Sequence, residues 1–360
     1  MVWSVRSGCE SAGTMQKVTE RRIAMIIIEV MGGLGNQMQQ YALYQKMKSL
    51  GKEAKLDVSW FFDENRQKSV LAARSLELEW FDHLPMECCT EQEKRALLGK
   101  GGFFGKVKKK LLPGTDRHFQ ETGMYHPEIF ELDNAYLSGF WACEKYYADI
   151  LPKLRELIVF PKQETGEKQA DGAGALENGA GRAAVTAGGV GESVDSEDAA
   201  RRNRGLMERM GQEISVSLHI RRGDYLDPEN AAMFGGICTD AYYEAAVRFI
   251  RECFPEAHFY VFSDDPDYAK ERYREPDFTV VDWNTGKNSL FDMQLMSCCK
   301  HNICANSTFS FWGARLNPSK DKIMIRPAKH KNGQDVGMER MQELWEGWKL
   351  IDGEGKMGVE

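Results

Sequence analysis

Short apolar runs alternate with helical patterns along most of this chain, and that alternation limits the fold more than any other feature. Near the N-terminus, the β-branched run "MIIIEV" (25–30) precedes the turn "GGLGNQ", a helical pattern closed by Gly51, and "AKLDVSW" (54–60), in which apolar and polar residues alternate. A strand, a Gly-rich turn, a helix and a second strand form a βαβ unit. The N-terminal half is therefore expected to contain a parallel sheet.

The second half repeats the alternation more regularly. "ISVSLHI" (214–220) alternates strictly, Thr239 is a plausible N-cap of the next helix, and "HFYVF" and "FTVVDW" are strand patterns. In the helical stretch "NSLFDMQLMSCCKH", Ser289 and Asp292 have the spacing of a capping box. The strands "NICAN" and "KIMIRP" then flank the helix-like "FSFWGARL". This order predicts an α/β fold with a second parallel, doubly wound sheet.

Composition divides the chain into segments. From about residue 161, a stretch rich in Gly, Ala and Glu contains no aromatic residue, and such a stretch cannot bury enough apolar surface to offset its ordering entropy. The predicted segments are a loose extension at 1–24, an N-terminal Rossmann-like domain at 25–160, a disordered linker or insertion at 161–210, a C-terminal domain at 211–335, and a C-terminal helix packing back on the body, with a tail, at 336–360.

Charge and cysteine usage narrow the functional class. The net charge of −7 disfavours nucleic acid as a partner. Nine cysteines without a CxxC pair indicate reduced thiols in a reducing compartment, so a cytoplasmic location is expected. No apolar run reaches the roughly 18–20 residues that span a bilayer. Peripheral contact with the inner face of a membrane is left open by the patch at 103–110 and by the face formed by Met338, Met341, Trp345 and Trp348, although a helix packed on the body is favoured for the tryptophans.

Polar clusters follow four of the predicted strands. Because the carboxyl ends of parallel strands share one edge of a sheet, the four loops are expected to line one crevice. The candidate site residues are Gly33, Gly35 and Asn36; His219, Arg221, Arg222 and Asp224; Ser263, Asp264 and Asp265; and Asn306, Ser307, Thr308 and Ser310.

These residue types suit an anionic ligand such as a nucleotide diphosphate. Arginine guanidinium groups match phosphate oxygens, and "NSTFS" offers hydroxyls and free backbone N–H groups at a helix N-terminus. Asp264 and Asp265 could accept from a base or a ribose, but an N-cap is an equally good interpretation. Arg222 could instead form an ion pair with Asp224, which would leave Arg221 alone at the ligand.

Two functions from other classes stay open at this point. The Gly-rich βα turn suggests an NAD-dependent oxidoreductase with a Rossmann domain, but the third glycine of the dinucleotide fingerprint is missing, since Met38 follows Gly33 and Gly35 at that distance. The same side chains could also belong to a non-catalytic protein that binds a sugar or a nucleotide.

Taken in series, "GGLGNQMQQYA", "HIRRGDY", "FSDD" and "NSTFSFWGA" resemble the α1,2-fucosyltransferase family, glycosyltransferase family 11, from residue 25 to about 348. The resemblance implies a GT-B fold, in which two Rossmann-like domains face each other across a cleft. It implies transfer of L-fucose, with inversion and without a metal or other cofactor, from GDP-fucose to O2 of a terminal β-galactoside that could be lipid-linked. A fucosyltransferase of different linkage or acceptor is the nearest alternative.

The resemblance also implies roles. Arg221 or Arg222 would meet the β-phosphate, Asp264 or Asp265 the guanosine, and Ser307, Thr308 and Ser310 the diphosphate, while Asn36, with Gly33 and Gly35, would lie near the fucose. Asp224 and His219 are the nearest candidates for the base that the acceptor hydroxyl needs, and either could instead orient the arginines. Gln39 departs from the family, which usually has an aromatic residue there, and the departure is expected to alter helix packing more than chemistry.

Overall fold

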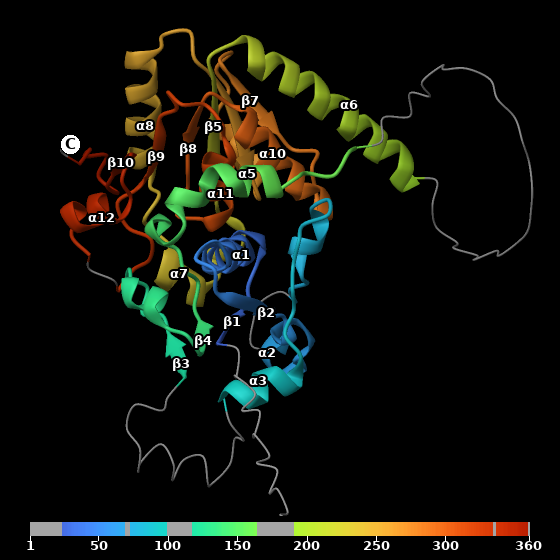
Figure 1. Cartoon of the computed structure of the whole chain (residues 1–360). Helices are drawn as coiled ribbons and strands as arrows, with labels where there is room; N and C mark the ends of the chain where they lie inside the picture. Colours follow the sequence, from blue (N-terminus) through green and yellow to red (C-terminus); the bar gives the residue numbers. More distant parts are fainter. Residues whose placement is uncertain (1–23, 69–72, 99–116, 164–190, 334–335, 359–360) are drawn as a thin grey trace, which may run out of the picture.

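The computed structural model describes residues 24–68, 73–98, 117–163, 191–333 and 336–358, and it has an α/β fold of GT-B type built on two parallel sheets (Figure 1). The sheet of the N-terminal domain has the order β2-β1-β4-β3, and all its pairs are parallel. Its strands are β1 (Met25–Glu29), β2 (Glu53–Asp57), β3 (His118–Gln120) and β4 (Ala135–Ser138).

The two faces of β1 are both covered, which is why Ile26, Ile27 and Ile28 are apolar in succession. Ile26 and Ile28 pack in the large core beside α1 (Leu34–Ser49), whereas Ile27 packs with Leu97 of α3 (Glu91–Leu98) on the other face. A parallel sheet with helices on both faces needs such continuous apolar strands.

The sheet of the C-terminal domain has six parallel strands in the order β10-β9-β8-β5-β6-β7. Numbered from β5, this is the 3-2-1-4-5-6 order of the dinucleotide-binding fold, and the order reverses between β5 and β8. The strands are β5 (Ser215–Ile220), β6 (His258–Ser263), β7 (Phe278–Val281), β8 (His301–Ile303), β9 (Met324–Pro327) and β10 (Trp348–Ile351). The α/β, doubly wound prediction is confirmed in both domains.

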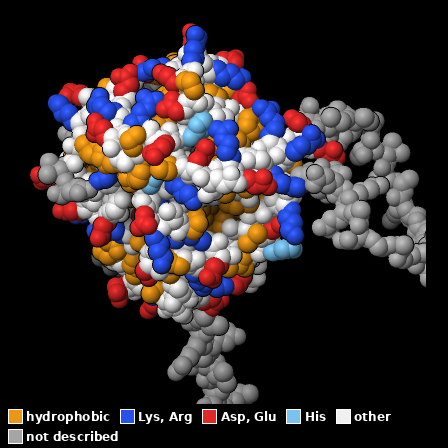
Figure 2. All heavy atoms as spheres, turned by 90° about the horizontal axis from the view of Figure 1, so that it is seen from above, with side chains coloured by type: hydrophobic (Ala, Val, Ile, Leu, Met, Phe, Trp, Pro, Cys, Tyr) orange, Lys and Arg blue, Asp and Glu red, His pale blue; other side chains and the backbone are white. Residues whose placement is uncertain are grey.

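The remaining described helices connect or cover these sheets. They are α2 (Glu64–Lys68), α5 (Leu151–Leu157), α6 (Gly191–Gln212), α7 (Pro228–Phe234), α8 (Asp240–Cys253), α9 (Pro266–Arg272), α10 (Ser289–Cys298), α11 (Thr308–Leu316) and α12 (Met338–Leu344). None of them has the length and the apolar composition needed to cross a bilayer. On the face drawn in Figure 2, acidic and basic side chains are interspersed, so that face carries no broad patch of a single charge.

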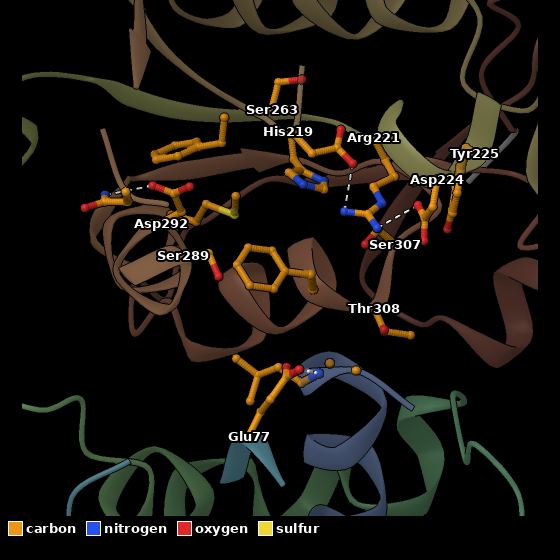
Figure 3. A pocket seen from close by; sticks show the side chains of 18 of the residues that line it. Glu77, His219, Arg221, Asp224, Tyr225, Ser263, Ser289, Asp292, Ser307 and Thr308 are labelled. Carbon is orange, nitrogen blue, oxygen red and sulfur yellow. Dashed lines mark hydrogen bonds and ion pairs between the residues drawn. The ribbon is translucent and has the colours of Figure 1, made fainter. Parts of the chain in front are cut away.

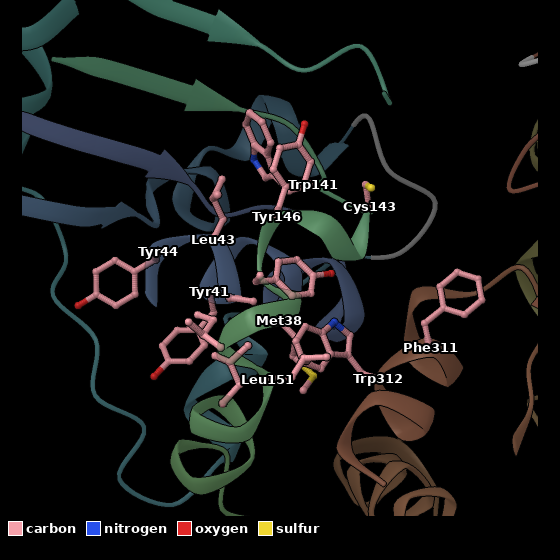
Figure 4. Close-up of a cluster of buried hydrophobic side chains, with 14 of the residues drawn as sticks. Met38, Tyr41, Leu43, Tyr44, Trp141, Cys143, Tyr146, Leu151, Phe311 and Trp312 are labelled. Atoms are coloured by element: carbon pink, nitrogen blue, oxygen red, sulfur yellow. The ribbon is translucent and has the colours of Figure 1, made fainter. Parts of the chain in front are cut away.

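The two domains share a hydrophobic core rather than meeting only through a linker. Trp312 of α11 stacks on Tyr147 of the N-terminal half at 5.8 Å between ring centroids, and Met38 of α1 lies in the same cluster (Figure 4). Arg315, which is fully buried at this junction, forms an ion pair with Glu144 at 3.0 Å. This packing fixes α1 and α11 against each other and thereby fixes the crevice between the domains.

The prediction of disorder over 161–210 is wrong at its C-terminal end. Helix α6 covers residues 191–212 and crosses one face of the C-terminal sheet (Figure 1). Leu206 and Met210, spaced four residues apart, pack against Tyr260 and Phe262 of β6, and Asn203 is buried on the same face. A narrow apolar stripe is enough to order a helix that docks on a sheet, and composition averaged over the segment hides it. Residues 164–190 of the predicted linker and 1–23 of the predicted extension lie outside the described residues.

The prediction for 336–360 is only partly correct. The helix ends at Leu344, Gly347 adopts a positive φ of 79°, and Trp348 begins β10, which pairs with β9 in the sheet. Trp345 and Trp348 are 3% and 1% exposed, so these rings form part of the core and do not present a membrane-facing surface. The second candidate for membrane contact, at 103–110, lies outside the part of the chain that the structure describes.

Candidate functional site

A cavity of about 630 Å³ lies between the domains at the carboxyl ends of both sheets (Figure 3). It meets the C-terminal sheet at the β5/β8 reversal, where Arg221 and Ser307 follow their strands, and it meets the N-terminal sheet where Gly33 follows β1 and Phe140 follows β4. Open parallel sheets bind ligands at such reversals. The structure therefore brings the four predicted loops together in one crevice.

Arg221 is the central cation of this cavity. Its Nη2 lies 2.6 Å from Asp224 Oδ1 and its Nη1 lies 2.8 Å from Asp264 Oδ2, so two carboxylates hold the guanidinium from two sides. These contacts use two of its five N–H donors. The remaining donors and the 27% exposure of the side chain leave Arg221 able to meet an anion in the cavity.

Arg222, by contrast, does not line the cavity. Its Nε lies 3.0 Å from Asp265 Oδ2 and its guanidinium stacks on Tyr268 at 3.8 Å, so it fastens β5 to the start of α9. The alternative in which Arg221 alone faces the ligand agrees with this geometry, but the partner of Arg222 is Asp265 and not Asp224.

The acidic pair after β6 is also engaged within the protein. Asp264 accepts from the backbone N–H of Arg222 at 2.8 Å as well as from Arg221, and a Cβ at Gly223 would lie 2.4 Å from Asp264 Oδ2. Asp265 is the N-cap of α9, accepts from the N–H of Tyr268 at 3.1 Å and lies outside the cavity lining. Ser263, which does line the cavity, accepts from the N–H of Asp265. The N-cap interpretation of Asp265 is confirmed.

The loop "NSTFS" places the N-terminus of α11 at the cavity. Ser307 is its N-cap, and Ser307 and Thr308 both line the cavity. Ser310 does not, since its buried hydroxyl donates to Ser307 O at 3.1 Å within the first turn. Asn306 is buried and binds the carbonyl groups of Phe234 and His330, so its amide mainly holds the neighbouring loops. The backbone N–H groups at this helix end are the donors that the segment can offer to an anion.

The Gly-rich turn after β1 faces α11. A Cβ on Gly35 would lie 2.5 Å from Thr308 Oγ1 and 2.6 Å from the backbone nitrogen of Phe309, so Gly35 allows two helix N-termini to approach closely. Thr308 Oγ1 donates to Asn36 Oδ1 at 3.0 Å across this contact. Gly33 is the N-cap of α1, and Gly33, Gly35 and Asn36 all line the cavity. The glycine is needed here for contact between domains, which the sequence did not indicate.

The two candidate bases are both constrained. Burial, with the charge of Arg221 as a second cause, lowers the pKa of His219 to about 3, and its Nδ1 has no hydrogen-bond partner among the described residues. Asp224 is held by Arg221 and lies 3.8 Å from Arg74 Nη2, which reaches it from the N-terminal domain. Its carboxylate is therefore held between a cation of its own domain and a cation of the N-terminal domain.

Several cavity residues were missed from sequence. Three of them, Arg74, Glu77 and Phe140, come from irregular segments of the N-terminal domain. Such segments have no helical or strand periodicity in their sequence, so the sequence does not predict which side chains face the cavity. Glu77 accepts from the N–H of Leu34 at 2.7 Å at the start of α1, and burial raises the pKa of its carboxyl. Asp292 of α10 is the fourth: its side chain does not act as the expected helix cap and lies in the cavity (Figure 3). Across the described ranges, no group of three His, Cys, Asp or Glu residues is arranged to hold a metal ion.

Comparison with known proteins matches this chain to one family. The model of "Glycosyl transferase family 11" matches residues 194–350. The Escherichia coli O-antigen biosynthesis glycosyltransferase WbnK is 30% identical over 318 residues, 83% of this chain and 92% of that protein. An α-1,2-colitosyltransferase of the same species is 26% identical over 319 residues, 85% of this chain and 92% of that protein. Human galactoside α-(1,2)-fucosyltransferase 1 is 30% identical over 103 residues, 28% of each chain.

The similarity to WbnK covers 83% of this chain, so it extends into both domains. A glycosyltransferase needs one site that joins a sugar donor to an acceptor, and the cavity shared by the two sheets has that form. The chain belongs to glycosyltransferase family 11.

Proposed function

We propose that this glycosyltransferase moves L-fucose from GDP-fucose to O2 of a terminal β-galactoside, forming an α1,2 linkage. The motif resemblance and the galactoside α-(1,2)-fucosyltransferase among the relatives support this donor and linkage, and the α-1,2-colitosyltransferase supports the linkage. The single structural observation that carries the proposal is Arg221, a cation at the strand-order reversal, facing the same cavity as the N-terminus of α11.

The leaving group explains why such an arrangement is useful. Glycosyl transfer builds negative charge on the departing diphosphate, and fixed donors aimed at that charge lower the barrier. Arg221 and the backbone N–H groups at the start of α11 supply such donors without a change of protonation state. We propose that they replace a divalent metal, that Ser307 and Thr308 add contacts to the diphosphate, and that no cofactor is needed.

The N-terminal domain would present the acceptor. Glu77, Arg74 and Phe140 line the cavity from that side, opposite the donor-binding loops. An inverting single displacement needs the acceptor hydroxyl to enter from the face of the sugar opposite the diphosphate. Because the two domains contribute opposite walls, an acceptor bound to the N-terminal wall would meet the sugar on the face opposite the diphosphate.

The decisive experiment incubates the purified protein with GDP-fucose and a small panel of galactosides and reads the product linkage by NMR. We expect an α1,2-linked product and unchanged turnover in EDTA. A matched incubation with a colitose donor tests the second candidate, which the α-1,2-colitosyltransferase relative favours. Turnover only with that donor would replace the fucose assignment. Abolition by EDTA with recovery in Mn²⁺ would contradict the metal-free mechanism.

A further inference from the structure

The end of the cavity away from Arg221 contains a carboxyl group without a cationic partner. Asp292 and Ser289 lie on one side of the cavity, and Arg221 and Asp224 lie on the other (Figure 3). Among the described residues, the one hydrogen bond to the Asp292 carboxyl comes from Asn284 Nδ2, at 2.8 Å from Oδ1. A carboxylate can accept about four hydrogen bonds, so most of its capacity is unused.

The other carboxylates that line the cavity are already engaged. Asp224 and Asp264 bind Arg221, and Asp282 lies 2.5 Å from Lys270 Nζ. Glu77 lies on the N-terminal side and accepts a backbone N–H at a helix start. Asp292 alone combines an enclosed position on the donor-binding domain with an oxygen that no described residue binds.

The orientation of Asn284 is fixed by a buried asparagine of α6. Asn203 Nδ2 donates to Asn284 Oδ1 at 2.9 Å, and Asn284 Nδ2 donates back to Asn203 Oδ1 at 3.1 Å. Because the oxygen of Asn284 is used in this reciprocal pair, its NH₂ group is the part that faces Asp292. Trp283 Nε1 donates to Asn203 Oδ1 at 2.7 Å and completes the network. This network holds Asp292 as a hydrogen-bond acceptor.

Three apolar side chains that pack in one cluster, Phe262, Val281 and Met296, line the same cavity as Asp292 and offer an apolar wall for a planar ring. Phe262 and Val281 stand at the ends of β6 and β7, and Met296 follows Asp292 by one helical turn on the same face of α10. Burial without a cation raises the pKa of the Asp292 carboxyl to about 8. A ligand that donates hydrogen bonds would stabilise the charged form of such a buried carboxyl group.

We infer that Asp292 reads the Watson–Crick edge of a guanine base, accepting from N1–H and from the exocyclic N2 amino group, while Phe262, Val281 and Met296 enclose the ring. Guanine is the common nucleobase that offers two adjacent N–H donors, and a paired acceptor is its complement. The inference rests on the proposed donor, and it moves base recognition from Asp264 and Asp265, which hold the arginines, to Asp292.

Adenine is the competing ligand, and the test separates the two. A protonated Asp292 could donate to adenine N1 and accept from its N6 amino group. Asparagine would keep that pattern but would present an NH₂ group to the guanine amino group. The variant Asp292→Asn should therefore turn preference from guanine toward xanthine, whose C2 carbonyl accepts from the asparagine amide.

The experiment measures the affinities of GDP, IDP, XDP and ADP by calorimetry. We expect the wild-type protein to bind GDP about tenfold or more tightly than IDP, which lacks the N2 amino group. In Asp292→Asn, GDP affinity should fall about 10- to 100-fold and XDP affinity should rise above it. The control Asp282→Asn changes a carboxylate of the same cavity end that is paired with Lys270 and should keep the wild-type order.

Three results would overturn the inference: equal wild-type affinity for GDP and IDP, unchanged base preference in Asp292→Asn, or preference of the wild type for ADP. The first comparison needs no variant, so it decides the matter even where Asp292→Asn fails to fold. The predicted base preference in a protein that transfers no fucose would refute the proposed function alone. If the wild-type protein transfers fucose but Asp292→Asn keeps the wild-type base preference, the inference is refuted and the proposed function stands.

Discussion

Thr308 Oγ1 donates a hydrogen bond of 3.0 Å to Asn36 Oδ1, and this contact joins the N-terminus of α11 to the N-terminus of α1 at the edge of the cavity. Both helix ends therefore face the same ligand space from different domains. Their separation is set by Gly35, because a side chain at that position would meet Thr308 and the backbone of Phe309.

The first prediction follows from this close approach. Gly35→Ala should push the two helix ends apart by a fraction of an ångström and lower kcat/KM about 100-fold, since small displacements of catalytic walls are costly. Gly205→Ala is the control, because a Cβ on that helical glycine meets nothing within 4 Å. Equal activity of Gly35→Ala and Gly205→Ala in steady-state assays would show that the domain contact does not set the site.

The two neighbouring arginines should differ when each is changed to lysine. Arg221→Lys loses the planar fork that holds Asp224 and Asp264 and faces the cavity, so kcat should fall by about 10²- to 10³-fold, the effect of losing one donor to a developing anion. Arg222→Lys loses its stacking on Tyr268 and weakens the link to Asp265, so it should mainly lower Tm. Rates and thermal melts measured on both variants would decide, and a larger kcat loss in Arg222→Lys would reverse the assignment.

Much of the site could be predicted because polar residues that follow parallel strands must share one edge of a sheet. Arg221, Asp264 and Ser307 come from three separate strand ends and line one cavity for that reason. What sequence could not show is the direction of each side chain. Arg221 and Arg222 are neighbours, but one faces the cavity and the other faces α9, which depends on the position of Asp265.

Asp292 illustrates a different difficulty. Its spacing from Ser289 fits a capping box, and local sequence offers no reason to choose otherwise. In the structure the N-cap is Asn288, and Asp292 binds Asn284, which is oriented by Asn203 of α6. The deciding contact comes from a helix whose composition suggested disorder, so the role of Asp292 depends on tertiary packing.

Phe140 leads to a prediction about the acceptor. The ring is 47% exposed and lines the cavity, while Glu121 Oε2 accepts from the N–H groups of Phe140 and Trp141 at 2.7 and 2.8 Å and holds the turn in place. If the cavity binds the acceptor as proposed, an exposed ring on a fixed turn can cover the apolar face of a hexose. Phe140→Ala should raise the acceptor KM about tenfold, for a loss near 1.4 kcal/mol, without changing GDP affinity.

Two variants check that assignment. Phe140→Trp keeps a ring at this position and should restore most of the acceptor affinity. Phe62→Ala removes a side chain that is 79% exposed outside the cavity lining and should leave the acceptor KM unchanged. If Phe140→Ala weakened GDP binding as much as acceptor binding, the ring would belong to the donor subsite.

The Asp292 carboxyl should make stability depend on pH. Its pKa in the folded protein is about 8, whereas an unfolded aspartate titrates near 3.9. Between these values the folded state holds a proton that the unfolded state has lost, so the wild-type protein loses stability as pH rises toward 8. Asp292→Asn lacks this titration. The Tm of Asp292→Asn minus that of the wild type should therefore increase between pH 5 and pH 9, by at least about 2 °C. A constant difference would mean that the carboxyl is ionised in the fold at pH 5.

Gln39 gives the last prediction. The side chain is fully buried in α1, and neither its amide nitrogen nor its amide oxygen has a hydrogen-bond partner among the described residues. An unpaired buried polar group costs about 1–3 kcal/mol, so Gln39→Met, which keeps a similar length without the amide, should raise the free energy of unfolding by about that amount. The neighbouring Gln40 is the matched control: it donates to Gly139 O at 2.9 Å and accepts from the N–H of Met31 at 3.0 Å, so Gln40→Met should destabilise the protein. Denaturant titration of both variants would test the pair, and a loss of stability in Gln39→Met would show that the amide is satisfied in solution.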